Sequence, residues 1–227
     1  MPANDDVWVV IPVFNEDQVI ADVVTDVRRT FPNVVCVDDG SRDRSAEQVA
    51  ATRAHLVRHP VNMGQGAALQ TGLSYALARP GGRYFVTFDA DGQHQVEDAL
   101  RMVEIAREGG ADVVLGSRFL DRPRRVPAAK RMVLRAVVAL SPNARRLQLT
   151  DAHNGLRVLT RPAAEGLRIT MNGMAHASEI VAQLARARVR VVEAPVTILY
   201  TEYSMSKGQS LINGVNILFD LSVRQRG

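Results

Sequence analysis

Short apolar runs alternate with amphipathic segments through the first half of the chain. Residues 7–13 are apolar almost without interruption and are followed by Asn15, which is typical of a strand buried on both faces of a sheet. Valines then recur at four-residue spacing over 19–27, which predicts a helix. The same reasoning gives strands at 34–38, 55–58, 84–88, 113–115 and 190–197, and helices at 44–53, 66–77, 96–107 and 175–186. This order predicts an α/β fold with a Rossmann-like, mostly parallel sheet flanked by helices.

The second half of the chain has a less regular pattern. Prolines interrupt a basic stretch there, an apolar pattern over 132–140 is suited to lying across a surface, and 211–223 predicts an amphipathic closing helix. No internal repeat, low-complexity segment or linker is visible. We therefore expect a single domain over residues 1–227.

Composition is that of an ordinary globular protein, with 46% hydrophobic and 23% charged residues. The first residues lack the basic and apolar regions of a signal peptide, and no apolar run reaches the roughly 18 residues that span a bilayer, so we expect no membrane crossing. The single cysteine, Cys36, lies in an apolar run and is expected to be a core residue in a reducing compartment.

Basic residues are concentrated in one segment of a chain whose formal net charge is +4. Between Arg118 and Arg146 the only acidic residue is Asp121. Such a block is either a solvated face or a surface that meets anionic lipid head groups, a phosphate or nucleic acid. Only 5% of the residues are aromatic, so stacking platforms for nucleic acid are scarce and a nucleic-acid-binding module is disfavoured.

Polar residues cluster where the predicted strands end. Ligands of open α/β sheets collect outside the carboxyl ends of the strands. Asp89 and Asp91 follow the fourth predicted strand, and two carboxylates at this spacing can face one hard cation such as Mg²⁺ or Mn²⁺. Taken alone the pair is equally consistent with a turn. His94 either completes such a site or caps the next helix.

Asp38 and Asp39 end the second predicted strand. Acids in this position accept hydrogen bonds from ribose hydroxyls or a base N–H, although Asp-Gly-Ser also makes a turn. The glycines at 64 and 66 do not have the spacing of a dinucleotide fingerprint, and there is no Walker A sequence. NAD and P-loop ATP chemistry are therefore disfavoured. A nucleotidyltransferase is disfavoured as well, because no glycine-rich basic loop follows the first strand.

Taken together, these motifs resemble one known family over nearly the whole chain, the family 2 inverting glycosyltransferases with the GT-A fold, in particular the dolichol-phosphate mannosyltransferase-like branch. The elements that match are Ile11-Pro12-x-x-Asn15-Glu16, Val37-Asp38-Asp39-Gly40-Ser41, Asn62-x-Gly64-x-Gly66-x-Ala68, Asp89-Ala90-Asp91-Gly92-Gln93-His94, Gly116-Ser117-Arg118, Asp151-x-x-x-Gly155-Leu156-Arg157, Glu193-x-Pro195-Val196 and Ser206-Lys207. Their order and spacing are more specific than any one motif.

The resemblance implies a metal-dependent enzyme that moves a sugar from a UDP- or GDP-sugar to a polyprenyl phosphate. It divides the domain into a nucleotide-sugar-binding half, residues 1–117, and an acceptor-binding half, residues 118–227. It also implies residue roles. The nucleotide would be held by Pro12, Asn15, Glu16, Asp38, Asp39, Gln65 and Asp89, the metal ion, Mg²⁺ or Mn²⁺, by Asp89, Asp91 and Gln93, and the acceptor phosphate by Arg118, Arg131 and Lys207. Phe14 replaces the tyrosine that is usual in the family, so a hydroxyl contact to the nucleotide is lost.

The catalytic residues implied are Asp89, Asp91, Arg118 and Asp151. A phosphate monoester is already largely ionised at neutral pH and needs no strong general base. A sugar hydroxyl of a glycan or glycolipid, the alternative acceptor, would need a carboxylate base, for which Asp151 and Glu179 are the candidates.

A lipid acceptor implies contact with a membrane. The basic block and the apolar faces of 132–140 and 211–223 would bind the cytoplasmic leaflet peripherally, unless those faces are ordinary core. A separate membrane protein is the other means of recruitment. We therefore expect a cytoplasmic enzyme at the inner face of the membrane, with a nucleotide-sugar and a polyprenyl phosphate as partners and no nucleic acid.

Overall fold

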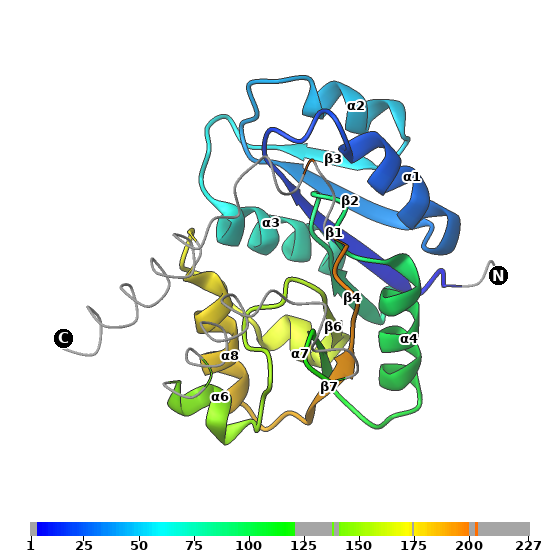
Figure 1. Cartoon of the computed structure of the whole chain (residues 1–227). Helices are drawn as coiled ribbons and strands as arrows, with labels where there is room; N and C mark the ends of the chain where they lie inside the picture. The colour runs from blue at the N-terminus through cyan, green and yellow to red at the C-terminus, as the bar shows by residue number, and fades with distance from the viewer. Residues whose placement is uncertain (1–3, 121–137, 139–140, 174, 200–202, 204–227) are drawn as a thin grey trace.

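A seven-stranded mixed sheet forms the centre of the computed structural model, which describes residues 4–120, 138, 141–173, 175–199 and 203 (Figure 1). The spatial order of the strands is β3-β2-β1-β4-β6-β5-β7. The strands are β1 (Val7–Val13), β2 (Asn33–Asp38), β3 (His55–Arg58), β4 (Tyr84–Thr87), β5 (Val113–Ser117), β6 (Arg157–Thr160) and β7 (Val191–Pro195). Only β6 runs antiparallel to its neighbours, β4 and β5. The predicted mostly parallel sheet is confirmed.

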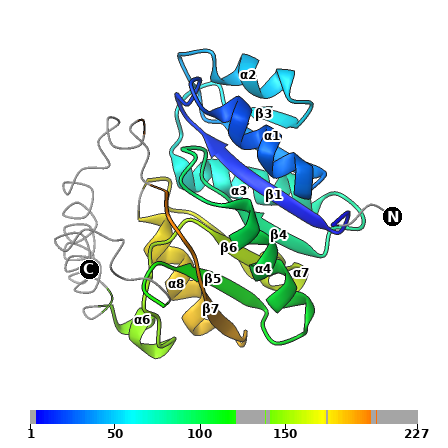
Figure 2. The same cartoon turned by 45° about the vertical axis from the view of Figure 1, so that its right-hand side comes forward.

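Helices cover both faces of the sheet. One face carries α1 (Ile20–Thr30), α2 (Ser45–Ala51) and α4 (Val96–Arg107). The other carries α3 (Gln65–Leu77), α6 (Pro142–Arg146), α7 (Arg161–Gly166) and α8 (His176–Arg186). Figures 1 and 2 show this three-layer arrangement from two sides.

The side chains of β1 show why both faces need cover. Every residue of the strand is buried. Val9 and Ile11 pack in the core beneath α1 and α4, whereas Trp8 and Val10 pack in the core beneath α3. Because successive side chains of a strand point to opposite faces, a continuously apolar strand must lie between two apolar layers.

Most predicted elements agree with the structure to within two residues at their ends, and the strand expected over 190–197 is shorter, Val191–Pro195. The sequence analysis missed β6 and the short helices α6 and α7. The closing helix expected over 211–223 lies outside the described residues, as does the pattern over 132–140 apart from Val138. None of the described helices is long and apolar enough to cross a lipid bilayer.

Candidate active site

The carboxyl ends of the parallel strands meet at one edge of the sheet, and the predicted site residues follow them. Because β6 is antiparallel, the loop before it reaches the same edge, and this loop carries Asp151 and Gly155. The topology therefore brings together Asp39 after β2, Asp89 after β4 and Arg118 after β5.

Asp89 is held by contacts from two different segments. The Nε2 atom of His94 lies 2.9 Å from its Oδ2 atom, and the Gln65 side-chain amide donates to its Oδ1 atom at 3.2 Å. Thus His94 binds Asp89, while Gln95 occupies the N-cap of α4. Asp91 accepts a hydrogen bond from the backbone N–H of Gln93 at 3.0 Å. The prediction that these carboxylates share one site is consistent with their mutual electrostatics.

The two carboxylates differ in pKa. Burial and the charge of Asp89 raise the pKa of Asp91 to about 6. Burial also acts to raise the pKa of Asp89, but the hydrogen bond and charge of His94, together with the charges of Arg157 and His176, outweigh it, so the pKa of Asp89 is lowered. One carboxylate is thus kept ionised while its neighbour resists ionisation, because two like charges lie close together in a half-buried site.

This donor set fits a divalent cation. Carboxylate oxygens suit Mg²⁺ and Mn²⁺, and a cation between Asp89 and Asp91 would relieve their repulsion. Among the described residues no three His, Cys, Asp or Glu side chains form a metal cluster, so water and donor phosphates would supply the remaining ligands. Gln93 contacts Asp91 through its backbone and its side chain is buried, so its role as a ligand stays a prediction.

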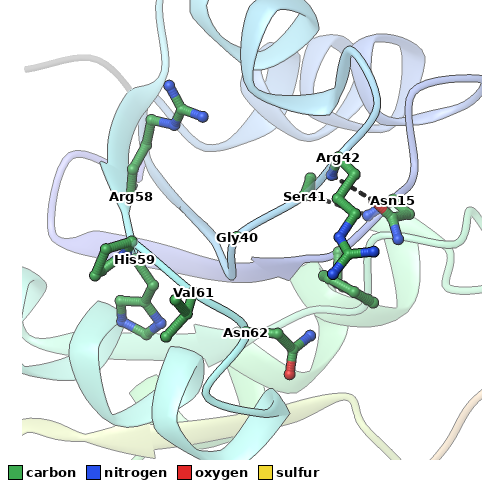
Figure 3. Close-up of a pocket in the computed structure, with 10 residues that line it drawn as sticks. Asn15, Gly40, Ser41, Arg42, Arg58, His59, Val61 and Asn62 are labelled. Carbon is green, nitrogen blue, oxygen red and sulfur yellow. Dashed lines mark hydrogen bonds between the residues drawn. The ribbon is translucent and has the colours of Figure 1, made fainter.

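A cavity of about 650 Å³ lies at the carboxyl ends of β1, β2 and β3 (Figure 3). It is large enough for a nucleoside. Its walls comprise Phe14, Asn15, Gly40, Ser41, Arg42, Arg58, His59, Pro60, Val61 and Asn62. Of the predicted nucleotide-binding residues only Asn15 lines it. The sequence analysis named Asn62 as part of a motif but missed His59, Pro60 and Val61, whose signal was their position directly after β3.

The loop after β1 is tied to the loop after β2. Asn15 adopts a left-handed backbone conformation with φ of 54°. Its N–H donates to the Ser41 hydroxyl at 3.0 Å and its side-chain oxygen accepts from the Arg42 N–H at 2.9 Å. Pro12 is buried within β1, and Glu16 accepts a 2.7 Å hydrogen bond from the Tyr203 hydroxyl. The last contact joins the donor side to a residue near the end of the chain.

Asp38 and Asp39 are both buried, and hydrogen bonds occupy both. Asp38 accepts from the Ser41 N–H and the Arg58 side chain, each at 3.2 Å. Asp39 accepts from the N–H groups of Met63 at 2.8 Å and Gly64 at 2.7 Å, and its Oδ1 atom lies 2.7 Å from His59 Nδ1. Asp39 thus fixes the loop between β3 and α3. Direct contact of either acid with a nucleotide stays a prediction.

Replacing Asp39 by asparagine is expected to destabilise the protein and to weaken nucleotide binding. Two backbone N–H groups point at its two different oxygens, so the amide NH₂ must oppose one of them, at about 1–3 kcal/mol for a buried unsatisfied donor. Urea denaturation and calorimetry with UDP and GDP would measure both effects. Asp26→Asn, on an exposed ion pair of α1, is the matched control and should change neither.

The loop before β6 packs directly against Asp89. A Cβ atom added to Gly155 would lie 2.0 Å from Oδ2 of Asp89 and 2.6 Å from its Cγ, so only glycine fits here. The Thr87 hydroxyl donates to the Gly155 carbonyl at 2.6 Å, which fixes this loop on β4. The position of the Asp89 carboxylate therefore depends on a glycine 66 residues further along the chain.

Arg118 and Asp151 form a bidentate ion pair. Nε of Arg118 lies 2.5 Å from Oδ2 of Asp151, and the second guanidinium contact is 2.7 Å. Burial acts to raise the pKa of Asp151, but the charge and hydrogen bonds of Arg118 hold it below its usual range. Glu193 accepts from the N–H groups of Thr150 and Asp151 and so holds this loop. Arg131 and Lys207 lie outside the described residues.

Large apolar side chains are also exposed at this edge. In the described part of the chain the exposed large hydrophobic residues are Phe14, Val61, Met63, Leu120 and Leu199. Each follows a parallel strand within a few residues, namely β1, β3, β5 or β7. The edge thus combines charged groups with apolar surface.

Comparisons with known proteins identify the family of this chain. The UDP-N-acetylglucosamine–dolichyl-phosphate N-acetylglucosaminyltransferase of Methanococcus voltae is 26% identical, over 97% of this chain and 96% of its own. The undecaprenyl-phosphate mannosyltransferase of Micrococcus luteus is 29% identical, over 91% of each chain. Glucosyl-3-phosphoglycerate synthase from Mycobacterium tuberculosis, solved with Mn²⁺, UDP and glucosyl-3-phosphoglycerate, superposes with a TM-score of 0.72 at 18% identity, over 97% of this chain and 80% of that one. Its likeness identifies the GT-A fold. Residues 8–168 match the model of glycosyl transferase family 2, and the chain belongs to this family of glycosyltransferases.

Proposed function

We propose that this glycosyltransferase transfers a sugar from a UDP- or GDP-sugar to a polyprenyl phosphate, with Mg²⁺ or Mn²⁺ bound at Asp89 and Asp91. The observation that carries the choice of acceptor is that hydrogen bonds or an ion pair occupy both candidate general bases. The donor class is supported by a nucleoside-sized cavity at the same edge of the sheet as Asp89, and by relatives whose names include a UDP-sugar or whose structure holds UDP.

A hydroxyl acceptor would need a carboxylate base that is free to accept a proton. Neither of the two expected bases, Asp151 and Glu179, is free in the described site. Asp151 is bound bidentately by Arg118, which lowers the pKa of the carboxyl. Glu179 accepts hydrogen bonds from the N–H groups of Thr170 and Met171, and although burial opposes it, these bonds lower its pKa. A carboxylate with a lowered pKa is a weak base. This favours an acceptor that arrives already ionised.

Arg118 is suited to bind such an acceptor. A guanidinium matches the oxygens of a phosphate as well as those of a carboxylate. Its side chain is 11% exposed, and the bidentate ion pair with the buried Asp151 fixes the orientation of the guanidinium. A phosphate drawn to Arg118 would lie at the edge of the sheet that also carries Asp89.

The divalent ion would neutralise the negative charge that develops on the leaving nucleoside diphosphate. The chain's own residues position the reactants. The cavity would orient the nucleoside, and Arg118 would orient the acceptor phosphate. The diphosphate would bind near Asp89 and Asp91, which hold the metal ion.

A lipid acceptor requires a membrane, and we propose that the enzyme binds the cytoplasmic leaflet peripherally. The exposed Leu120 and Leu199 on the acceptor side and the exposed Arg145 and Arg146 of α6 support this, because apolar and basic side chains together favour anionic lipid surfaces. The rest of the basic block lies outside the described residues, and recruitment by a separate membrane protein is the alternative.

Arg118→Ala is expected to lower transfer to a short, water-soluble prenyl phosphate by about 100-fold, mainly through a higher KM for the acceptor, because a charge-assisted bidentate contact contributes roughly 1.5–3 kcal/mol. The slow hydrolysis of the nucleotide-sugar without acceptor should change little. Parallel assays of transfer and hydrolysis separate the two effects.

Arg145→Ala is the matched control, since Arg145 is an exposed arginine of the same basic segment. Transfer by Arg118→Ala at the rate of Arg145→Ala would remove Arg118 from the acceptor site. Transfer to a sugar hydroxyl in place of the prenyl phosphate would show that the acceptor is a glycan.

A further inference from the structure

A buried arginine beneath the active site has no assigned role. Arg157 is the first residue of β6 and is only 3% exposed. Its Nη1 atom is buried and has no hydrogen-bond partner among the described residues. A guanidinium stays protonated in proteins, so this is a full positive charge inside the molecule.

The strand register places this charge beside Asp89. In the antiparallel pair of β4 and β6, Thr87 is opposite Arg157 and Val86 is opposite Val158. Extending the ladder by two residues sets Asp89 opposite Gly155, in agreement with the close approach of Gly155 to the Asp89 carboxylate. Asp89 is therefore the diagonal neighbour of Arg157 on the same face, within reach of a long side chain.

Charge interactions agree with this placement. Burial lowers the pKa of the Arg157 guanidinium, and the carboxylates of Asp89 and Asp151 oppose that shift. The same positive charge, together with burial, lowers the pKa values of His153, to about 4, and His176, so neither imidazole adds a positive charge at neutral pH. Arg157 is thus a buried cation whose charge acts on both Asp89 and Asp151.

The position of the Asp89 carboxylate does not depend on Arg157. His94 and Gln65 bind its two oxygens, and Gly155 packs against it. No hydrogen bond joins Asp89 to Arg157 in the described structure. Loss of the guanidinium would consequently change the charge near Asp89 more than its geometry.

We infer that Arg157 is a positioning residue that acts through its charge, weakening the attraction of Asp89 and Asp91 for a divalent cation so that tight binding of the ion requires the negative charge of a nucleoside diphosphate. The inference rests on the proposed metal site. It ties metal binding to the presence of the donor, and release of the ion to departure of the nucleotide product.

The test compares Mn²⁺ binding to the purified proteins by the electron paramagnetic resonance signal of free Mn²⁺, alone and with UDP. Arg157→Met should bind Mn²⁺ alone about tenfold or more tightly, because a buried like charge has been removed. Arg157→Lys, which keeps the charge, should stay close to the wild type. The dependence of Mn²⁺ affinity on UDP should shrink in Arg157→Met only.

Arg161→Met is the matched control. Arg161 lies four residues further on and donates to the carbonyls of Gly82, Leu77 and Arg79, away from the carboxylates. Its replacement should lower stability without tightening Mn²⁺ binding. If the role of Arg157 were merely structural, Arg157→Met would weaken Mn²⁺ binding, whereas the inference predicts that it tightens Mn²⁺ binding.

Unchanged or weaker Mn²⁺ binding by folded Arg157→Met overturns the inference and leaves the proposed function standing. If Arg157→Met does not fold, Arg157→Gln, which keeps a polar head without charge, takes its place. Failure of both to fold makes the residue structural and also overturns the inference. Absence of Mn²⁺ binding by the wild type, with and without UDP, instead contradicts the proposed metal site itself.

Discussion

Asp91→Asn is expected to lower turnover by about 1000-fold while the protein stays folded. A neutral amide cannot replace a charged ligand of a divalent ion, which contributes several kcal/mol of charge stabilisation, and each 1.36 kcal/mol is a factor of ten. Steady-state transfer with the nucleotide-sugar and Mn²⁺ held at saturation measures the loss.

Asp91→Asn should lower turnover without lowering the thermal stability of the protein. Burial and the charge of Asp89 raise the folded-state pKa of Asp91 from its ordinary value of 3.8 to about 6, so stability is lost as the pH rises from about 4 to about 6 and the full cost remains above that range. Asp91→Asn removes this cost, so its thermal midpoint at pH 8 should equal or exceed that of the wild type. Asp22→Asn, an exposed acid of α1, is the control for both measurements. Wild-type turnover of Asp91→Asn in the presence of excess chelator would contradict the metal assignment.

Gly155→Ala should reduce turnover by about 100-fold, since displacement of a catalytic group by 1 Å can cost that factor. The added methyl group would lie 2.0 Å from Oδ2 of Asp89, so the carboxylate must leave its present position. Overpacking of this kind costs typically 1–3 kcal/mol of stability. Kinetics and Mn²⁺ binding together with urea denaturation would follow the change.

Gly166→Ala is the matched control, because a Cβ atom at Gly166 meets no atom within 4 Å and its backbone is not left-handed. It should keep wild-type turnover and Mn²⁺ affinity. Wild-type turnover in Gly155→Ala would mean that the observed position of Asp89 is not the one used in catalysis.

The residues proposed to bind the donor could largely be predicted from the sequence, because they all follow one rule of α/β sheets. Apolar strands buried on both faces give continuous hydrophobic runs, and their carboxyl ends carry the polar ligands. Asn15, Asp39 and Asp89 were found by this rule, and the structure places them on neighbouring strand ends of one sheet edge. What the rule does not give is their internal hydrogen bonds, so a role of Asp39 in fixing a loop was not anticipated.

The residues proposed to bind the acceptor are harder to predict, because β6, the strand that follows their loop, is not a parallel, fully apolar strand. Strand β6 has four residues, begins with a charged one and runs antiparallel, so its start reaches the site. The run Arg157-Val158-Leu159-Thr160 is too short to be separated from a loop by its apolar pattern. Gly155 and Arg157 therefore received no role from the sequence, although both belong to a motif that it shows.

The place of β6 in the sheet also determines the order in which the sheet can be assembled. Strands β1 to β4 are neighbours of one another and can pair once β4 has been synthesised, whereas in the described sheet β5 has β6 and β7 as its neighbours, and both come later in the chain. The ribosome adds roughly 5–20 residues per second, so the roughly 40 residues between β5 and β6 leave the edge of β4 and both edges of β5 unpaired for several seconds.

Unpaired edges are templates for aggregation. We therefore expect the nascent chain to have an open edge at β4 until β6 has been synthesised. Chaperones should therefore be needed most while the residues before β6 are being synthesised. The yield of folded enzyme should depend on how quickly β6 pairs with β4.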